Sequence, residues 1–225
     1  MIASPTTGLD HIDLDVCEKR GIKVISLKGE TEFLKTIPSV AELTFWMMLE
    51  LSRRPHPEKI GRYFGNQLKG SVLGIIGFGR IGKQVAERAN AFKMRIQYYD
   101  PYLLYESLFS FDTPDYSEDT ESVDFRKILE ESDIISVHVP LNKETKNMIG
   151  ERELLSMKKD AILINTARPE IINYHALVKA VSEGWIGGYG QDFCDYDLIK
   201  LYERNYNIIC TNHIGGNTRQ ARIET

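Results

Sequence analysis

Residues 74–82 read GIIGFGRIG, in which Gly77, Gly79 and Gly82 have the spacing G-x-G-x-x-G. The apolar run at 71–78 predicts a strand before this stretch, residues 80–92 predict a helix, and residues 94–100 predict a second strand. Between a strand and a helix, glycines at this spacing allow a tight turn, close approach of the backbone to a ligand, and close helix–strand packing. The stretch therefore predicts a strand–helix–strand unit with an anion site at the N-terminus of its helix.

The rest of the chain continues the alternation of strands and helices. Further strands are predicted at 133–140, 161–168, 185–193 and 207–214, and helices at 125–132, 151–159 and 173–184. Such alternation is typical of an α/β protein with a doubly wound parallel sheet, as in a Rossmann domain. Residues 102–122 are acidic and patternless in their second half, which predicts an excursion over the surface.

The N-terminal segment predicts a smaller unit. A short strand at 1–4 precedes a helix in which we expect Leu14 and Cys17 to point inward, and residues 22–27 predict a second strand. A helix follows at 40–54. It is apolar over most of its surface, so we expect it to be buried, partly against a second subunit.

Helix boundaries can also be predicted. Ser39 and Glu42 have capping-box spacing at the start of helix 40–54, and Pro55 would end this helix. At the end of the chain, either Asn217 or Thr218 could cap one further short helix.

Composition excludes several classes of protein. The formal net charge of −4 argues against a nucleic-acid or anionic-membrane partner, and the apolar runs are shorter than the ~20 residues of a membrane span. The three cysteines, Cys17, Cys194 and Cys210, are odd in number and far apart. This pattern favours buried free thiols over a disulfide framework or a metal site. With no signal-peptide pattern, we expect a soluble cytoplasmic protein.

An acidic residue supports a dinucleotide site at the glycine stretch. Asp100 ends the second strand of the unit, 18 residues after Gly82. Its carboxylate would accept hydrogen bonds from ribose hydroxyls and would repel a 2′-phosphate, so NAD is favoured over NADP. The alternative is a packing loop with a coincidental aspartate.

Polar clusters end four of the predicted strands, at 138–140 (HVP), 165–168 (NTAR), 191–193 (QDF) and 211–213 (TNH). Open α/β sheets bind ligands at the carboxyl ends of their strands, so we expect these clusters to converge on one site. Taken singly, His138 could be structural, Arg168 a surface arginine, Asp192 a helix cap and His213 a loop histidine.

Eight motifs along the chain resemble, in order, those of the NAD-dependent D-2-hydroxyacid dehydrogenases. They are TTGLDHIDL, SVAELT, GIIGFGRIG, YDP, SDIISVHVPL, LINTAR, GQDF and TNHIGG. This family includes D-3-phosphoglycerate, D-lactate and glycerate dehydrogenases. The resemblance implies an NAD-binding Rossmann domain at 37–217 and a partial flavodoxin-like substrate domain at 1–36. It also implies that 218–225 begin a return helix, that the chain is truncated at both ends, and that helix 40–54 forms a homodimer.

The resemblance also implies a small 2-oxo or 2-hydroxy acid as substrate. Arg168 matches the arginine that binds the substrate carboxylate and carbonyl, and His213 matches the acid–base histidine. Asp197 takes the place of the glutamate that pairs with this histidine, with Asp195 as the alternative. The implied cofactor-binding residues are Gly77, Gly79, Arg80, Ile81, Gly82, Asp100, His138, Val139, Pro140, Thr166, Ala167, Arg168, Asp192, His213 and Gly215.

Three departures from the family pattern bear on activity. Asp197 is one methylene shorter than glutamate, which predicts a lower pKa for His213 than is usual in the family. Pro169 replaces a glycine after Arg168, and Tyr174 replaces an acidic residue. The main hypothesis is an enzyme that transfers hydride between NADH and C2 of a 2-oxo acid. The alternatives are a catalytically weak NAD-binding dimerisation module and, less favoured, a corepressor-like protein.

Overall fold

The computed structural model describes residues 1–9, 11–53, 64–103, 120–204 and 206–224. Its larger part is a parallel seven-stranded sheet of order β5-β4-β3-β6-β7-β8-β9. The strands are β3 (Val72–Ile76), β4 (Arg95–Tyr99), β5 (Thr120–Ser122), β6 (Ile134–Val137), β7 (Ile162–Asn165), β8 (Gly188–Gln191) and β9 (Ile208–Cys210). The order reverses between β3 and β6, so the predicted doubly wound α/β sheet is confirmed.

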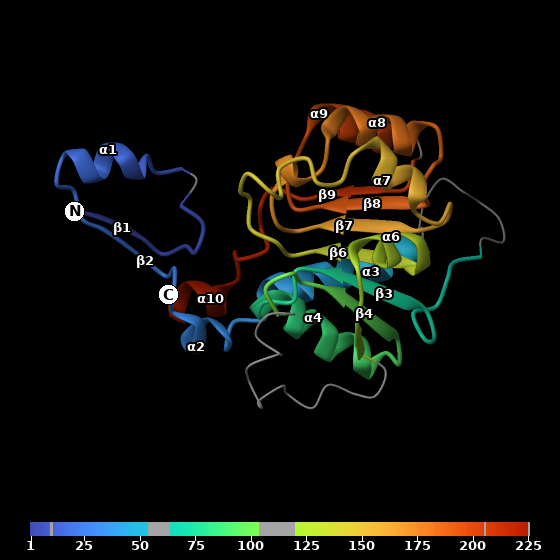
Figure 1. The fold of residues 1–225 in the computed structure, drawn as a ribbon, viewed down its shortest axis with the longest axis horizontal. Helices are drawn as coiled ribbons and strands as arrows, with labels where there is room; N and C mark the ends of the chain where they lie inside the picture. Colours follow the sequence, from blue (N-terminus) through green and yellow to red (C-terminus); the bar gives the residue numbers. More distant parts are fainter. Residues whose placement is uncertain (10, 54–63, 104–119, 205, 225) are drawn as a thin grey trace.

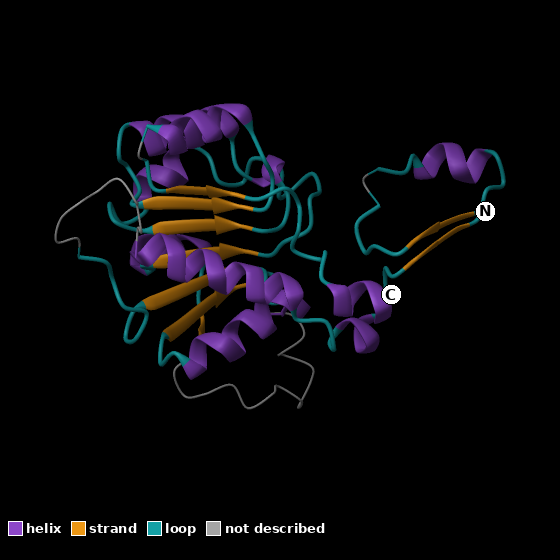
Figure 2. Cartoon of the chain, turned by 180° about the vertical axis from the view of Figure 1, so that it is seen from behind, coloured by secondary structure: helices purple, strands orange, loops and turns teal. Residues whose placement is uncertain are grey.

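Helices cover both faces of this sheet (Figures 1 and 2). One face packs against α3 (Ser39–Arg53) and α4 (Arg80–Ala91). The other packs against α6 (Phe125–Glu131), α7 (Glu151–Ser156), α8 (Tyr174–Ser182) and α9 (Tyr196–Glu203). Within β3, Ile75 belongs to the first core and Ile76 to the second, because successive strand side chains point to opposite faces.

A smaller unit lies beside the sheet. It contains β1 (Ile2–Ser4), α1 (Leu14–Lys19) and β2 (Val24–Ser26), with the two strands parallel. In Figure 1 this unit stands apart from the seven-stranded sheet. Two short helices, α2 (Thr31–Leu34) and α10 (Arg219–Glu224), lie between them, and Leu34, Ile37 and Ala221 form a cluster there.

The expected inward orientation of the α1 side chains is half right. Cys17 is buried at 7% exposure, whereas Leu14 is 43% exposed. Leu14 is the first residue of α1, and a two-stranded sheet offers too little surface to cover both ends of the helix.

The observed helix starts correct the predicted cap at Ser39 and decide between Asn217 and Thr218 as the cap of the last helix. Ser39 does not cap α3, because the Pro38 carbonyl accepts the Glu42 N–H and Ser39 lies inside the first turn. Its buried hydroxyl has no hydrogen-bond partner among the described residues. Thr218 is the cap of the last helix, since its hydroxyl accepts the Ala221 N–H. Pro55 lies outside the described residues.

Four elements of the described residues were not predicted, namely α2, the 3₁₀ helix η1 (Pro169–Ile171), β5 and α9. Residues 120–122 form the edge strand β5, although the whole of 102–122 was expected to be an excursion; residues 104–119 lie outside the described part. The helix α9 occupies a segment for which no element was predicted. Across the described residues, no helix is both long and apolar enough to cross a membrane.

Candidate active site

The glycine stretch forms the turn between β3 and α4. Gly77 has a φ of 91°, and a Cβ there would lie 2.8 Å from the backbone of His138. A Cβ at Gly82 would collide with the Gly77 carbonyl oxygen. Packing of the protein itself therefore requires both glycines.

Gly79 has no such internal reason to be glycine. It is the N-cap of α4, with φ −74°, and a Cβ built on it would meet no atom within 4 Å. The space over the turn is open, and the first N–H groups of α4, at Arg80 and Ile81, have no partner within the helix. This open turn fits a pyrophosphate group. The Arg80 guanidinium donates hydrogen bonds outside the turn, to the carbonyls of Leu34 (3.1 Å) and Ile37 (3.4 Å).

Asp100 stabilises the glycine turn from the end of β4. Its carboxylate accepts the Phe78 N–H at 2.9 Å and the Tyr102 N–H at 3.1 Å. These bonds fix an acidic group next to the open turn. The predicted contact with ribose hydroxyls stays a prediction.

His138, Val139 and Pro140 follow β6, the strand next to β3. The His138 Nε2 lies 2.6 Å from the Ser136 hydroxyl, and its Nδ1 is buried without a partner among the described residues. Burial lowers the pKa of His138 to about 3, so its ring is neutral at physiological pH. The backbone here fills the space that a Cβ at Gly77 would need.

Thr166, Ala167 and Arg168 follow β7, and Asn165 organises them. Its side-chain oxygen accepts the Ala167 N–H at 3.0 Å, and its amide donates to the Arg168 carbonyl at 2.8 Å. The Thr166 hydroxyl lies 3.1 Å from the Thr44 hydroxyl of α3. These bonds hold the segment at the end of the strand.

Pro169 fits the backbone it occupies. Arg168 is extended, with φ −144° and ψ 138°, which is the conformation that a following proline favours. Pro169 itself opens the 3₁₀ helix η1 (Pro169–Ile171), at a position whose N–H would have no helical partner. The proline therefore restricts Arg168 without removing a needed donor.

Asp192 holds the loop that carries His213. It follows β8, is 2% exposed, and accepts three hydrogen bonds of 2.7 Å, from the Thr211 hydroxyl and the N–H groups of Ile214 and Gly215. Between these anchors His213 is exposed and has a φ of 54°. A left-handed non-glycine residue is strained by about 1–3 kcal/mol and persists only where its surroundings enforce it. The anchors thus place one histidine at the edge of the sheet.

The two carboxylates expected to pair with His213 bind a different residue. Asp195 accepts a hydrogen bond of 2.6 Å and Asp197 one of 2.9 Å, both from the Tyr174 hydroxyl. Among the described residues, neither carboxylate forms a hydrogen bond or ion pair with His213. The sequence prediction of a His213–carboxylate pair therefore differs from the structure.

The remaining predicted residues converge as expected. Gly77, His138, Thr166 and Asp192 follow the adjacent parallel strands β3, β6, β7 and β8, so they share the carboxyl edge of the sheet. The loop of His213 joins them, because its residues Thr211, Ile214 and Gly215 donate to Asp192.

Sequence reasoning missed three contacts at this edge. The Phe193 ring lies 4.8 Å from the His213 ring, centroid to centroid. The Gln191 amide donates to the Phe193 carbonyl at 2.7 Å, and its oxygen accepts the buried Tyr189 hydroxyl at 2.8 Å. Gln191 and Phe193 both lie in the quoted GQDF motif. The contact of Phe193 with His213 joins residues that follow two different strands, so it cannot be read from one strand alone.

The thiols near this edge differ from the expectation of burial. Cys194 is exposed and Cys210 is half-buried, while Cys17 alone of the three is buried. Burial raises the pKa of Cys210 to about 12, so this thiol stays protonated.

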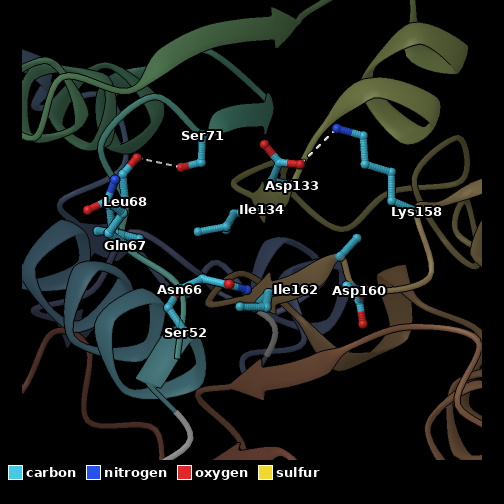
Figure 3. A pocket seen from close by; sticks show the side chains of 11 residues that line it. Ser52, Asn66, Gln67, Leu68, Ser71, Asp133, Ile134, Lys158, Asp160 and Ile162 are labelled. Carbon is cyan, nitrogen blue, oxygen red and sulfur yellow. Dashed lines mark hydrogen bonds and ion pairs between the residues drawn. The ribbon is translucent and has the colours of Figure 1, made fainter. Parts of the chain in front are cut away.

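A cavity of about 330 Å³ lies at the opposite edge, near the amino ends of β3, β6 and β7 (Figure 3). The ion pair of Lys158 with Asp133, 2.7 Å long, lies in its wall. Ligands of open α/β sheets bind at the carboxyl edge, so we do not assign the cofactor to this cavity.

A family model and several relatives match most of this chain. Residues 45–215 match the family described as D-isomer specific 2-hydroxyacid dehydrogenase, NAD binding domain. The chain is 39% identical to glyoxylate reductase of Thermococcus litoralis, over 99% of this chain and 69% of the relative. It is 35% identical to hydroxypyruvate reductase of Thermotoga maritima, over 99% of this chain and 72% of that one.

Solved structures agree with this match. The D-lactate dehydrogenase of Aquifex aeolicus, complexed with NAD and lactic acid, has a TM-score of 0.79 and 31% identity, covering 99% of this chain and 72% of that one. The chain belongs to the D-isomer specific 2-hydroxyacid dehydrogenase family, and its seven-stranded unit is the NAD-binding domain of that family.

Proposed function

We propose that this protein reduces the C2 carbonyl of a small 2-oxo acid with NADH, using His213 as acid and Arg168 to bind the substrate. The observation that carries the proposal is the loop of His213, held in a strained conformation by three hydrogen bonds to buried Asp192. Strain enforced in this way at a ligand-binding edge is typical of functional sites.

NAD bound at the glycine turn would supply the hydride. Its pyrophosphate would lie over Gly79 at the N-terminus of α4, with Asp100 beside the adenosine ribose. The open space at Gly79 supports this placement.

The residues of the chain would do the rest. The Arg168 guanidinium would bind the substrate carboxylate and stabilise the negative charge that grows on the carbonyl oxygen. His213 would donate a proton to that oxygen, and would remove it in the reverse reaction. The substrate class is supported by relatives named glyoxylate reductase and hydroxypyruvate reductase, so we expect one of these two-to-three-carbon acids to react best.

We also propose the domain organisation and assembly that the sequence predicted. Residues 37–217 would bind NAD, residues 1–36 would belong to the substrate domain, and 218–225 would return to it. The position of α2 and α10 between the two units supports this division. The chain would act as a homodimer through α3, because Trp46 and Leu49 leave 44% and 39% of their side chains exposed there.

A second candidate is an NAD-binding module with little turnover. It is favoured by the Tyr174 hydroxyl, which binds both carboxylates expected to support His213. Such a protein would bind NADH as tightly as an enzyme of the family but would reduce 2-oxo acids slowly.

Turnover separates the two candidates. NADH oxidation would be followed with glyoxylate, hydroxypyruvate, pyruvate and phosphohydroxypyruvate, for the wild type and for His213→Ala. His175→Ala, which removes an exposed histidine on α8, is the matched control. We expect His213→Ala to reduce kcat/KM by about 10²–10⁴-fold and the control to leave it unchanged. NADH binding by the wild type without turnover of any of the four acids would favour the second candidate.

A further inference from the structure

Two departures from the family pattern, far apart in the sequence, contact each other in the fold. Tyr174 is the first residue of α8, and Asp195 and Asp197 lie at the start of α9. The two helices run side by side on one face of the sheet (Figure 1). The Tyr174 hydroxyl donates to Asp195 Oδ1 at 2.6 Å and to Asp197 Oδ2 at 2.9 Å.

The position of Asp195 is fixed by a second set of contacts. As N-cap of α9, its Oδ1 also accepts the N–H groups of Asp197 (3.0 Å) and Leu198 (3.4 Å). The Asp195 carboxylate thus connects the Tyr174 hydroxyl to the N-terminus of α9. Burial, followed by the hydrogen bonds to Asp195 and Asp197, raises the pKa of Tyr174, so the phenol remains a donor at physiological pH.

His213 has a different neighbour. Its ring lies against Phe193, and the Tyr174-bound carboxylates make no hydrogen bond or ion pair with it within the described part of the chain. Phe193 precedes Asp195 by only two residues, so the acidic segment is joined directly to the ring that packs against His213.

We propose that Tyr174 is a positioning residue that holds Asp195 and Asp197 against α8 and so keeps His213 without a carboxylate partner. The proposal rests on the role proposed above for His213. A neighbouring carboxylate stabilises an imidazolium, so Tyr174 sets how readily His213 is protonated. Tyr174, which stands where the family pattern has an acidic residue, and Asp197, which stands where it has glutamate, then act together.

Other charged or titratable groups lie on the elements around the His213 loop, and the experiment must leave them unchanged. They are Glu42 on α3, Arg168 after β7, Asp192 and Cys194 after β8, and Cys210 in β9. Asp192 is already satisfied by its three donors in the loop.

The test is an NMR titration of the His213 imidazole in the full chain. Tyr174→Phe removes only the hydroxyl, and we expect the pKa of His213 to rise by about one pH unit as a carboxylate becomes free to approach. Tyr196→Phe is the matched control, because it removes a phenol from an exposed ring at the start of α9, where the ring contacts Lys200. The control should leave the His213 titration unchanged.

Asp197→Asn and Asp195→Asn give a second measurement that does not depend on the tyrosine variant. In the wild-type background we expect neither to lower the pKa of His213, whereas adding both to Tyr174→Phe should abolish its rise. A fall of the His213 pKa in Tyr174→Phe, or no change, would overturn the proposal, and so would a fall in either asparagine variant alone.

The kinetic counterpart is the alkaline limb of kcat/KM for 2-oxo acid reduction, which should move to higher pH in Tyr174→Phe by the same amount. A purely structural role for Tyr174 would lower thermal stability without moving this limb. The titration does not require turnover. Failure of the proposed enzyme activity would therefore appear as absent NADH oxidation in the wild type, independently of the result for Tyr174.

Discussion

The three glycines of the turn between β3 and α4 have different structural roles. Gly77 and Gly82 are required by neighbouring protein atoms, since a Cβ at either position would approach the backbone too closely. Gly79 is not, because its surroundings are open and its φ of −74° suits any residue. Substitutions of these glycines can therefore distinguish effects on the stability of the fold from effects on the binding of the cofactor.

Gly79→Ala and Gly82→Ala should therefore fail in different ways. We expect Gly82→Ala to lower the free energy of unfolding by about 1–3 kcal/mol, as overpacking does. Gly79→Ala should leave stability nearly unchanged and weaken NADH binding about tenfold, which is roughly 1.4 kcal/mol. Urea unfolding and NADH fluorescence titration measure the two effects. Unchanged NADH affinity in Gly79→Ala would contradict the placement of the pyrophosphate.

His138 should make stability depend on pH. Its pKa is lowered by burial from 6.5 to about 3, so the unfolded chain binds the proton more readily than the folded one. The contribution of His138 to the free energy of unfolding is complete above pH 6.5. It is lost as the pH falls toward 3, by up to about 1.4 kcal/mol per pH unit. Urea unfolding at pH 7.5 and 5.5 should show a smaller loss in His138→Gln than in the wild type. Equal losses in the two proteins would refute this.

At the scale of elements, η1 shows how a sequence departure can be structurally neutral. Pro169 follows an extended Arg168 and opens the 3₁₀ turn, where proline is favoured. The sequence alone raised the concern that proline would disturb the arginine. The structure removes it, because the conformation of Arg168 is the one that proline enforces.

Restoring the family glycine at this position should therefore be unfavourable. We expect Pro169→Gly to lower the free energy of unfolding by about 0.4–1 kcal/mol, since the unfolded chain gains conformational freedom. Arg168 would also lose a restraint, so KM for the 2-oxo acid should rise while kcat changes less. Thermal unfolding and steady-state kinetics measure both. A more stable variant with lower KM would show that the proline strains the site.

Elements with strong patterns were predictable, and several with weak patterns were not. The strands around β3 and the helix α4 follow from apolar runs and glycine spacing. The edge strand β5 has three residues and no apolar side chain, so pairing with β4 alone defines it. The cap at Ser39 was mispredicted because its hydroxyl lies inside the turn, while the Pro38 carbonyl accepts the bond that begins α3.

At the scale of the whole molecule, the topology brings distant motifs together. Parallel strands place the residues after β3, β6, β7 and β8 at one edge, and this convergence was predictable from the alternation of elements. The partners of individual side chains were not. Tyr174 and Asp197 are separated by 23 residues and meet only because α8 and α9 lie side by side.

The apolar surface of α3 bears on assembly. Trp46 and Leu49 are 44% and 39% exposed, and Phe92, at the end of α4, is 41% exposed next to Phe45. If α3 forms the homodimer, Trp46→Lys should weaken association by about 2–4 kcal/mol, which is the range of an interface hot spot.

Analytical ultracentrifugation over a range of protein concentrations would detect the dissociation. Leu155→Lys is the matched control, because Leu155 is 56% exposed on α7, on the opposite face of the sheet. Equal effects of the two substitutions, or a wild type that is monomeric at every concentration, would exclude a dimer through α3.

The central claim is that hydride passes from the cofactor at the glycine turn to C2 of an acid held near His213. The most direct measurement uses NADH with deuterium in place of both C4 hydrogens, with glyoxylate and pyruvate as substrates, and analyses the products by NMR and chiral chromatography. We expect deuterium at C2 of glycolate and of D-lactate, and at least about 10²-fold slower formation of these products with His213→Ala. Product without deuterium at C2, or L-lactate, would contradict this claim.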